Sequence, residues 1–221
     1  MKPGVQAAPS PTAAPTLPTG SSRLDVKPRN RTKADIYVLG TTPPTLVKDY
    51  RKRGLLARLY GRACLNREEQ ALRRLAGLKG VPAFVARDGP CVLSMQFIEA
   101  TPLHDLRKAG QVPPGFVDRL EQLMVAVEER GVAHADPHMR NILCDREGQP
   151  YLVDFSTSYL RGRVPVLSRW IFHNLQVMRK LKVQKLRRKL CGESVEIDVR
   201  PGLIYRAIHF LGRLRRGRRR R

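Results

Sequence analysis

The sequence contains few cysteines, few acidic residues and no long apolar run. Its cysteines, Cys64, Cys91, Cys144 and Cys191, lie far apart, and no pair has the spacing of zinc ligands or of a redox motif. We therefore expect reduced thiols, as in cytosolic proteins. No run of about eighteen apolar residues occurs, which excludes a spanning helix, and no apolar core of a secretion signal is found near residue 1. These absences predict a cytoplasmic protein that can contact the inner face of the cell membrane.

Acidic residues are scarce relative to basic ones. The chain has 42 Lys and Arg residues against 19 Asp and Glu residues, which gives a formal net charge of +23. Residues 161–221 hold 19 of the basic residues and 3 of the acidic ones. Such a positive field favours anionic partners, including nucleotides, nucleic acids, anionic lipids and acidic sugar polymers.

The order of sequence patterns predicts a two-lobed α+β protein. Residues 1–30 are rich in Pro, Ala, Ser and Thr and have too few apolar side chains to offset the entropy of ordering, so we predict a disordered tail. Order is expected from about "DIYVLG" onward, and "RLDVK" is a further candidate for the first strand. We predict strands at 36–39, 45–50, 83–86, 91–97, 141–144 and 151–155, and helices at 65–78 and 113–131.

Polar residues with catalytic potential gather between Gly131 and Ser158. His134-x-Asp136 is followed by Asn141, and Asp154-Phe155 stands at the end of a predicted strand. Carboxylates and an amide at strand ends suggest a functional site. Asp136 and Asn141 could instead cap turns. A zinc site is a further alternative, although the stretch lacks both cysteine partners and H-E-x-x-H spacing.

This pattern resembles the protein-kinase-like superfamily, whose catalytic loop reads H-R-D-x-x-x-x-N and whose metal motif reads D-F-G. The resemblance implies a small β-rich N-lobe, a mainly helical C-lobe, and the use of ATP and Mg²⁺. It implies that Asp136 orients or deprotonates a hydroxyl acceptor and that Asn141 and Asp154 hold the metal. On the same pattern, His134 braces the catalytic loop through hydrogen bonds.

The nucleotide side of the resemblance lies upstream. Lys48 in "TLVKDY" resembles the strand lysine that contacts the α- and β-phosphates, and Glu68 resembles the helix glutamate that holds this lysine. Glu69 is an alternative partner, because the sequence does not fix the phase of the helix. Met95 would be the gatekeeper, and the backbone of residues Gln96 to Ile98 would face the adenine.

The chain departs from the protein-kinase pattern in three ways. It has no G-x-G-x-x-G, and the loop after "RLDVK" is basic, so that Arg29, Arg31 or Lys33 could neutralise phosphate instead. Ser156 replaces the glycine of D-F-G. No A-P-E follows, and only "TSYLRGR" separates the hairpin from the next helix. These features resemble a compact branch, the RIO-type kinases and the kinases of lipopolysaccharide core sugars (Kdo and heptose). "D-x-H-x-x-N", with His138, also occurs in aminoglycoside-phosphotransferase-like members.

The C-terminal region is basic and amphipathic. The stretch 168–190 can form a helix whose apolar stripe packs on the large lobe. Its other side carries seven cations: Arg179, Lys180, Lys182, Lys185, Arg187, Arg188 and Lys189. Residues 202–221 repeat this arrangement and end in arginines, which favours an anionic membrane surface as partner. Nucleic acid is the less favoured alternative, because no set of aromatic side chains for base stacking stands beside the arginines.

These observations together predict four segments and one function. The segments are a tail at 1–30, an N-lobe at 31–98, a C-lobe at 99–190 and a basic helix and tail at 191–221. The predicted function is an ATP- and Mg²⁺-dependent kinase, with a lipopolysaccharide core sugar as favoured acceptor. A RIO-like Ser/Thr protein kinase, a nucleotide-binding pseudokinase scaffold and an RNA-binding protein with a residual kinase fold are the alternatives.

Overall fold

The computed structural model describes residues 23–26, 33–162 and 165–192, including the side chains of 33–162 and 170–192. Chain contacts divide the protein into two compact units: Met1–Arg62 with Val85–Phe97, and Ala63–Phe84 with Ile98–Arg221. The division differs from the predicted lobes, because the helical segment after Arg62 belongs to the second unit. The predicted basic helix and arginine tail lie almost wholly outside the described residues.

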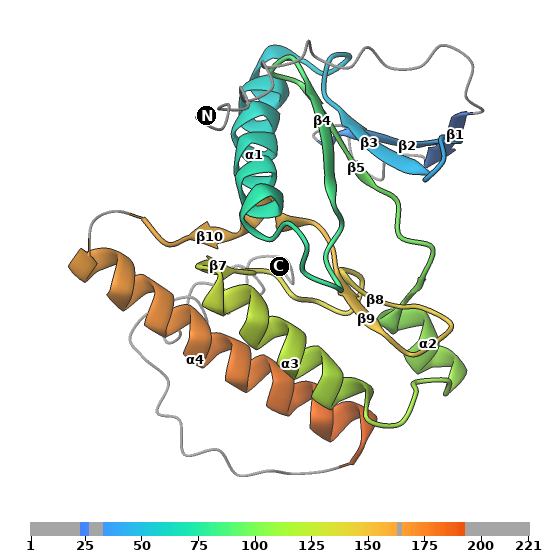
Figure 1. Cartoon of the computed structure of the whole chain (residues 1–221), viewed down its shortest axis with the longest axis vertical. Helices are drawn as coiled ribbons and strands as arrows, with labels where there is room; N and C mark the ends of the chain where they lie inside the picture. The colour runs from blue at the N-terminus through green and yellow to red at the C-terminus, as the bar shows by residue number, and fades with distance from the viewer. Residues whose placement is uncertain (1–22, 27–32, 163–164, 193–221) are drawn as a thin grey trace, which may run out of the picture. The chain divides into compact units, whose positions relative to one another are not determined.

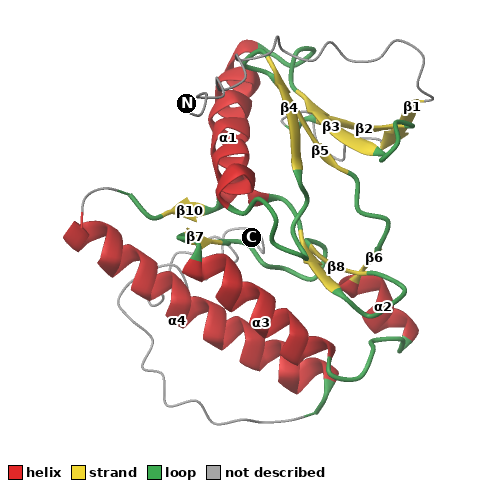
Figure 2. Ribbon diagram, in the orientation of Figure 1, coloured by secondary structure: helices red, strands yellow, loops and turns green. Residues whose placement is uncertain are grey.

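The first unit is built on an antiparallel sheet (Figure 2). Its strands follow the order β1-β2-β3-β5-β4. Side chains alternate between the two faces of a strand, and Tyr37, Leu39, Val47 and Val92 thereby form a buried cluster. The strands are β1 (Arg23–Val26), β2 (Asp35–Leu39), β3 (Thr45–Asp49), β4 (Phe84–Asp88) and β5 (Val92–Gln96).

Strand β1 pairs with β2 at the position of "RLDVK". It falls within residues 1–30, so the prediction of disorder is wrong for this short piece. Residues 1–30 as a whole have few apolar side chains, but antiparallel backbone hydrogen bonds to β2 extend the sheet by this strand without requiring a large buried surface.

Helix α1 runs over Leu55–Arg74 and is longer at its start than the predicted helix at 65–78. The added turns carry Leu55 and Leu56, which are exposed and lie on a different face of the helix from the leucines on which the prediction rested. Further along, Leu65, Leu72 and Leu75 are buried, as the predicted face requires. The helix ends before Gly77, whose positive φ of 76° suits the turn that follows.

The second unit is mainly helical, with α3 and α4 side by side (Figure 1). In α3, Phe116, Leu120, Leu123, Met124 and Val127 are buried, which confirms the stripe that the sequence predicts. Phe172, Val183 and Leu186 of α4 are also buried, and this confirms that the helix packs on the large unit. The helices are α2 (Leu103–Ala109), α3 (Phe116–Glu129) and α4 (Pro165–Leu190).

Short strands complete the second unit. The β8–β9 hairpin confirms the predicted one within a few residues, and β10 pairs with β7, the strand that leads into His134. None of the helices in the described ranges is long and apolar enough to cross a membrane. The strands are β6 (Thr101–Pro102), β7 (Val132–Ala133), β8 (Ile142–Cys144), β9 (Pro150–Leu152) and β10 (Tyr159–Leu160), with a 3-10 turn η1 at Phe155–Thr157.

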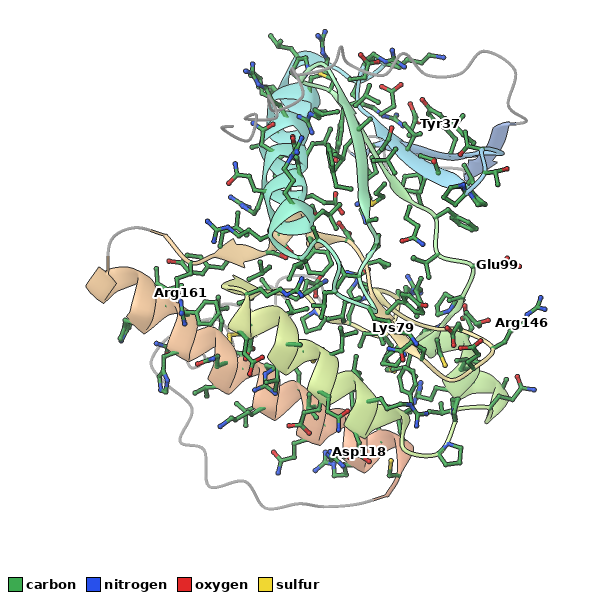
Figure 3. The ribbon with its side chains drawn as sticks, viewed as in Figure 1. Tyr37, Lys79, Glu99, Asp118, Arg146 and Arg161 are labelled. Atoms are coloured by element: carbon green, nitrogen blue, oxygen red, sulfur yellow. The ribbon has the colours of Figure 1, made fainter. Side chains whose placement is uncertain are left out.

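Ion pairs join α3 to α4. The Arg179 guanidinium lies 2.9 Å from the carboxylate of Glu128 and 3.6 Å from that of Glu121. About two turns further along α4, the Arg187 guanidinium contacts the carboxylate of Glu121 at 2.9 Å and that of Asp118 at 2.5 Å. Asp118 is labelled on α3 in Figure 3. Burial raises the pKa of Glu128, and the adjacent Arg179 opposes this shift. Arg179 and Glu128 therefore form a largely buried ion pair, in which each charge is stabilised by the other.

We predict that Arg179→Met destabilises the protein by about 3 kcal/mol, because it leaves the buried carboxylate of Glu128 without its cation. The measurement is equilibrium unfolding in urea. Lys180→Met is the matched control, since Lys180 is the next residue on α4 and is exposed, and it should change stability by less than about 0.5 kcal/mol. Equal effects of the two substitutions would contradict the assignment.

Candidate active site

The loop from His134 to Asn141 is held in shape by its own backbone and by one side-chain amide. The His138 N–H donates to the Asp136 carbonyl at 2.9 Å, and the Asn141 N–H donates to the His138 carbonyl at 2.8 Å. The Asn141 side-chain Nδ2 also donates to the Asp136 carbonyl, at 3.1 Å. Asn141 therefore fixes the backbone of Asp136, which explains physically why the amide follows the aspartate at this spacing.

His134 braces this loop against the strand that leads to Asp154. Its Nε2 donates to the Val153 carbonyl at 3.0 Å, and its ring meets the Phe155 ring edge-on, with centroids 4.8 Å apart. Burial lowers the pKa of His134, so the neutral ring is favoured. With Nε2 protonated, the buried Nδ1 is an acceptor, and it has no hydrogen-bond partner among the described residues. This geometry suits a bracing role rather than proton transfer to a substrate.

Asp136 presents its carboxylate to solvent, with the His138 ring 3.7 Å away. Behind it, Lys182 of α4 donates a hydrogen bond from Nζ to the Ala135 carbonyl at 3.1 Å. Burial lowers the pKa of Lys182, and the negative charge of Asp136 partly opposes that shift. Sequence reasoning missed this contact, because Lys182 is one of seven cations on one helix and nothing in their spacing separates it from the others.

The β8–β9 hairpin brings Asn141 and Asp154 to one end. Ile142 pairs with Leu152, and beyond this pair the Val153 N–H donates to the Asn141 carbonyl at 3.0 Å. Asp154 follows directly with a positive φ of 64°, a conformation that costs a residue with a side chain about 1 kcal/mol or more. The Ser156 hydroxyl donates to Asp154 Oδ1 at 2.7 Å. The carboxylate of Asp154 is thus held by strained backbone and a neighbouring hydroxyl.

Glu68 and Glu69 have different surroundings. Glu68 is fully buried, and its Oε1 accepts a hydrogen bond from the backbone N–H of Phe155 at 3.2 Å. Glu69 is paired on the helix surface with Arg73, one turn further along, at 2.9 Å. Of the two candidates, the structure therefore links Glu68 to the Asp154–Phe155 motif.

The residues predicted to face the nucleotide divide between the two units. Lys48 lies on β3 opposite Leu93 of β5, and Met95, which is buried, lies opposite Leu46. Gln96 is also in the first unit, whereas Ile98 and Glu68 are in the second. The pairing of Lys48 with Glu68 therefore stays a prediction. Lys33 is exposed, and Arg29 and Arg31 lie outside the described residues.

The chemistry of these side chains suits magnesium better than zinc. In the part of the chain that the structure describes, no group of three or more His, Cys, Asp or Glu side chains is arranged to hold a metal ion. Asn141 and Asp154 supply an amide oxygen and a carboxylate, the ligands that Mg²⁺ takes together with waters and phosphates. The Asn141 side chain uses its NH₂ group within the protein, which leaves its oxygen as the part suited to a cation.

Comparisons with known proteins show the family of the chain. The sequence model of the RIO domain matches residues 48–163, more than half of the chain. The chain therefore belongs to the RIO domain family, within the protein-kinase-like superfamily. A search of curated protein sequences found no match.

Solved structures show the same fold. Rio2 kinase from Chaetomium thermophilum, in an ADP/Mg²⁺-phosphoaspartate complex, is similar with a TM-score of 0.57 and 14% identity, over 86% of this chain and 60% of that one. WbdD is similar with a TM-score of 0.50 and 18% identity, over 68% of this chain and 35% of that one. The chain thus spans less than two thirds of the length of either relative. The predicted kinase-like α+β fold is confirmed.

We predict that Glu68→Leu destabilises the protein by about 2 kcal/mol or more, because it leaves the N–H of Phe155 buried without an acceptor. Amide hydrogen exchange at Phe155 should become faster in the same variant. Glu68→Gln retains an acceptor oxygen and should restore much of that protection, and Glu69→Gln is the surface control. If the Phe155 amide stays equally protected in Glu68→Leu, this hydrogen bond does not hold the motif.

Proposed function

We propose that the protein is an ATP- and Mg²⁺-dependent phosphotransferase that acts on a hydroxyl group. The observation that carries this proposal is the arrangement of Asp136, Asn141 and Asp154 within one compact unit. Asn141 is bonded on one side to the Asp136 backbone and on the other to Val153, the neighbour of Asp154. Phosphoryl transfer requires an orienting carboxylate beside two oxygen ligands for the metal, and Asp136, Asn141 and Asp154 are the side chains of the loop and hairpin that we assign to these parts.

Each residue has a defined part in the proposed reaction. Asn141 and Asp154 would hold Mg²⁺, which when bound neutralises the developing charge on the phosphates. Asp136 would accept a hydrogen bond from the acceptor hydroxyl and take its proton as the hydroxyl oxygen bonds to the γ-phosphorus of ATP and the bond from that phosphorus to the leaving ADP breaks. Lys48 would contact the nucleotide phosphates, while His134 and Glu68 would act as positioning residues. Family membership and likeness to Rio2 kinase, whose complex contains ADP and Mg²⁺, support these parts.

The favoured acceptor is an acidic sugar of a lipopolysaccharide core. The segment after the Asp154–Phe155 motif supports a small acceptor, because it is short and tied down: Ser158 bonds to Phe155 at 3.0 Å, and Arg161 bonds to Gly131 at 2.8 Å. The guanidinium of Arg161, which is labelled in Figure 3, also lies over the Phe172 ring, 4.4 Å from its centroid. Little chain remains to dock an extended peptide. Membership of the RIO family supports the alternative acceptor, a protein Ser or Thr hydroxyl.

The acceptor can be identified by incubating the purified protein with γ-labelled ATP and either a membrane extract or a soluble protein fraction. A sugar acceptor places acid-stable label in the glycolipid fraction, and a Ser or Thr acceptor places acid-stable label in protein. Label in protein that hydroxylamine removes would indicate an acyl phosphate, the group named in the Rio2 complex. Each outcome assigns a different acceptor chemistry to the same site.

Asp136→Asn should lower ATP-dependent transfer by about a hundredfold or more while nucleotide binding persists, because it removes the proton acceptor and leaves the phosphate-binding groups intact. The measurement combines label transfer with titration of a fluorescent ATP analogue. Asp105→Asn, an exposed carboxylate on α2, is the matched control and should retain activity. No transfer by the unaltered protein to any fraction, together with unchanged binding in both variants, would favour a pseudokinase scaffold.

Lys182→Met should lower transfer by about tenfold, because it releases the carbonyl before Asp136 and removes a nearby cation. Burial lowers the pKa of Lys182, so its charge is present at low pH and is lost as pH rises through that lowered value. Lys182→Arg should therefore shift the alkaline limb of the pH–rate profile upward. Lys185→Met, exposed on the same helix, should leave rate and profile unchanged. A change in stability without a change in profile would reduce Lys182 to a structural role.

A further inference from the structure

The first two turns of α1 expose four large side chains that the proposed reaction does not use. Leu55 is 70% exposed, Leu56 83%, Leu59 57% and Tyr60 61%. Single exposed leucines are ordinary, but neighbouring ones on one face mark an interaction surface. We propose that this surface, Leu55-Leu56-Leu59-Tyr60, docks the protein on an anionic lipid membrane.

The helix geometry gathers these side chains on one side. At about 100° per residue, positions 55, 56, 59 and 60 fall within a sector of about 140°. The opposite side of the helix is fixed by Gly61, where an added Cβ would lie only 2.4 Å from the buried ring of Tyr50. Because Gly61 packs so closely on that ring, the helix cannot rotate to bury the leucines within the first unit.

Cations lie beside the apolar surface, and acidic residues are absent from its part of the sequence. Lys52, Arg58 and Arg62 are exposed and form no ion pair with any residue that the structure describes. The preceding arginines differ, since Arg51 pairs with Asp49 at 2.7 Å and Arg53 pairs with Asp35. From Tyr50 to Arg67 the sequence contains no Asp or Glu. The uncompensated charges therefore lie beside the exposed leucines.

This combination fits a lipid headgroup layer. A helix can carry apolar side chains on one face and Lys or Arg beside that face. At a membrane surface, the apolar side chains then insert at the acyl boundary, and the cations stay among the anionic headgroups. Tyrosine, with an apolar ring and a polar tip, is typical of that interface. A basic protein partner would be repelled by the same cations. The proposal does not depend on phosphotransfer, because it concerns residues outside the candidate active site.

The test is co-sedimentation of the full-length chain with vesicles of equal parts phosphatidylcholine and phosphatidylglycerol, with pure phosphatidylcholine vesicles for comparison. Leu56→Ser combined with Leu59→Ser should weaken binding to the anionic vesicles by about tenfold or more. Arg58→Glu combined with Arg62→Glu should weaken it by about fivefold or more for each charge. Val125→Ser and Lys108→Glu, exposed positions on α3 and α2, are the controls and should leave affinity unchanged.

A second readout separates insertion of this surface from attraction through the basic C-terminal residues. Tyr60→Trp in a Trp170→Phe background leaves one indole, because the chain has a single tryptophan. When the protein binds anionic vesicles that contain a shallow doxyl-labelled lipid, the fluorescence emission of this indole should shift to shorter wavelength and be quenched.

Three outcomes would overturn the proposal: no binding to anionic vesicles, binding without quenching, or binding that the leucine substitutions leave unchanged. Self-association of the protein that is lost in the leucine variant, without vesicle binding, would instead identify a second copy of the chain as the occupant. Failure of vesicle binding would leave label transfer by the active site unaffected, so the two proposals fail separately.

Discussion

The peptide groups of Val153 hold the candidate site together. The N–H of Val153 donates to the Asn141 carbonyl at 3.0 Å, and its carbonyl accepts from His134 at the same distance. One residue of the hairpin is thus bonded to both the beginning and the end of the loop that carries Asp136. Since Asp154 follows immediately, any displacement of Val153 would move Asp154 relative to both Asn141 and Asp136. The buried Glu68 carboxylate adds a third anchor on the N–H of Phe155.

The motif residues and the secondary-structure types were predictable, because short-range spacing encodes them. The H-x-D-x-x-x-x-N spacing puts Asn141 within reach of the Asp136 carbonyl, and alternation of apolar residues marks the hairpin that ends near Asp154. Periodicity also located α3, since a helix that packs on a core must bury every third or fourth side chain. The prediction of α1 stopped short of Leu55–Tyr60, whose apolar side chains lie on a different face of the helix from the buried Leu65, Leu72 and Leu75.

Contacts between distant parts of the chain were not predictable. Glu68 and Glu69 are chemically identical neighbours, and only the packing of α1 shows which one is buried against Phe155. Lys182 reaches Ala135 from 47 residues further along the chain, a separation over which local patterns carry no information. The sequence marked "RLDVK" as a candidate strand, but it could not show that this strand pairs with β2, because that pairing depends on backbone groups that every sequence supplies.

The basic composition of α4 has two physical meanings. The sequence alone predicts that all seven cations between Arg179 and Lys189 lie on the side of the helix that faces away from the large lobe, where they could bind an anionic partner. Three of them are used within the protein: Arg179 and Arg187 bind the carboxylates of α3, and Lys182 binds the backbone before Asp136. The charge available to an external partner is therefore smaller than the composition implies. The cations beside the exposed leucines of α1 pair with no carboxylate among the residues that the structure describes, which makes their position more informative than the total charge.

The serine in place of the D-F-G glycine has a structural explanation. A glycine at this position would supply backbone freedom, but the residue with positive φ here is Asp154, and Ser156 lies inside a 3-10 turn that any residue can adopt. The serine hydroxyl instead donates to Asp154 Oδ1 at 2.7 Å, which orients the carboxylate that the strained backbone presents. Part of the conformational cost at Asp154 is thus offset by a hydrogen bond that glycine could not make. The departure from the protein-kinase pattern is therefore compatible with a carboxylate held ready for a metal ion.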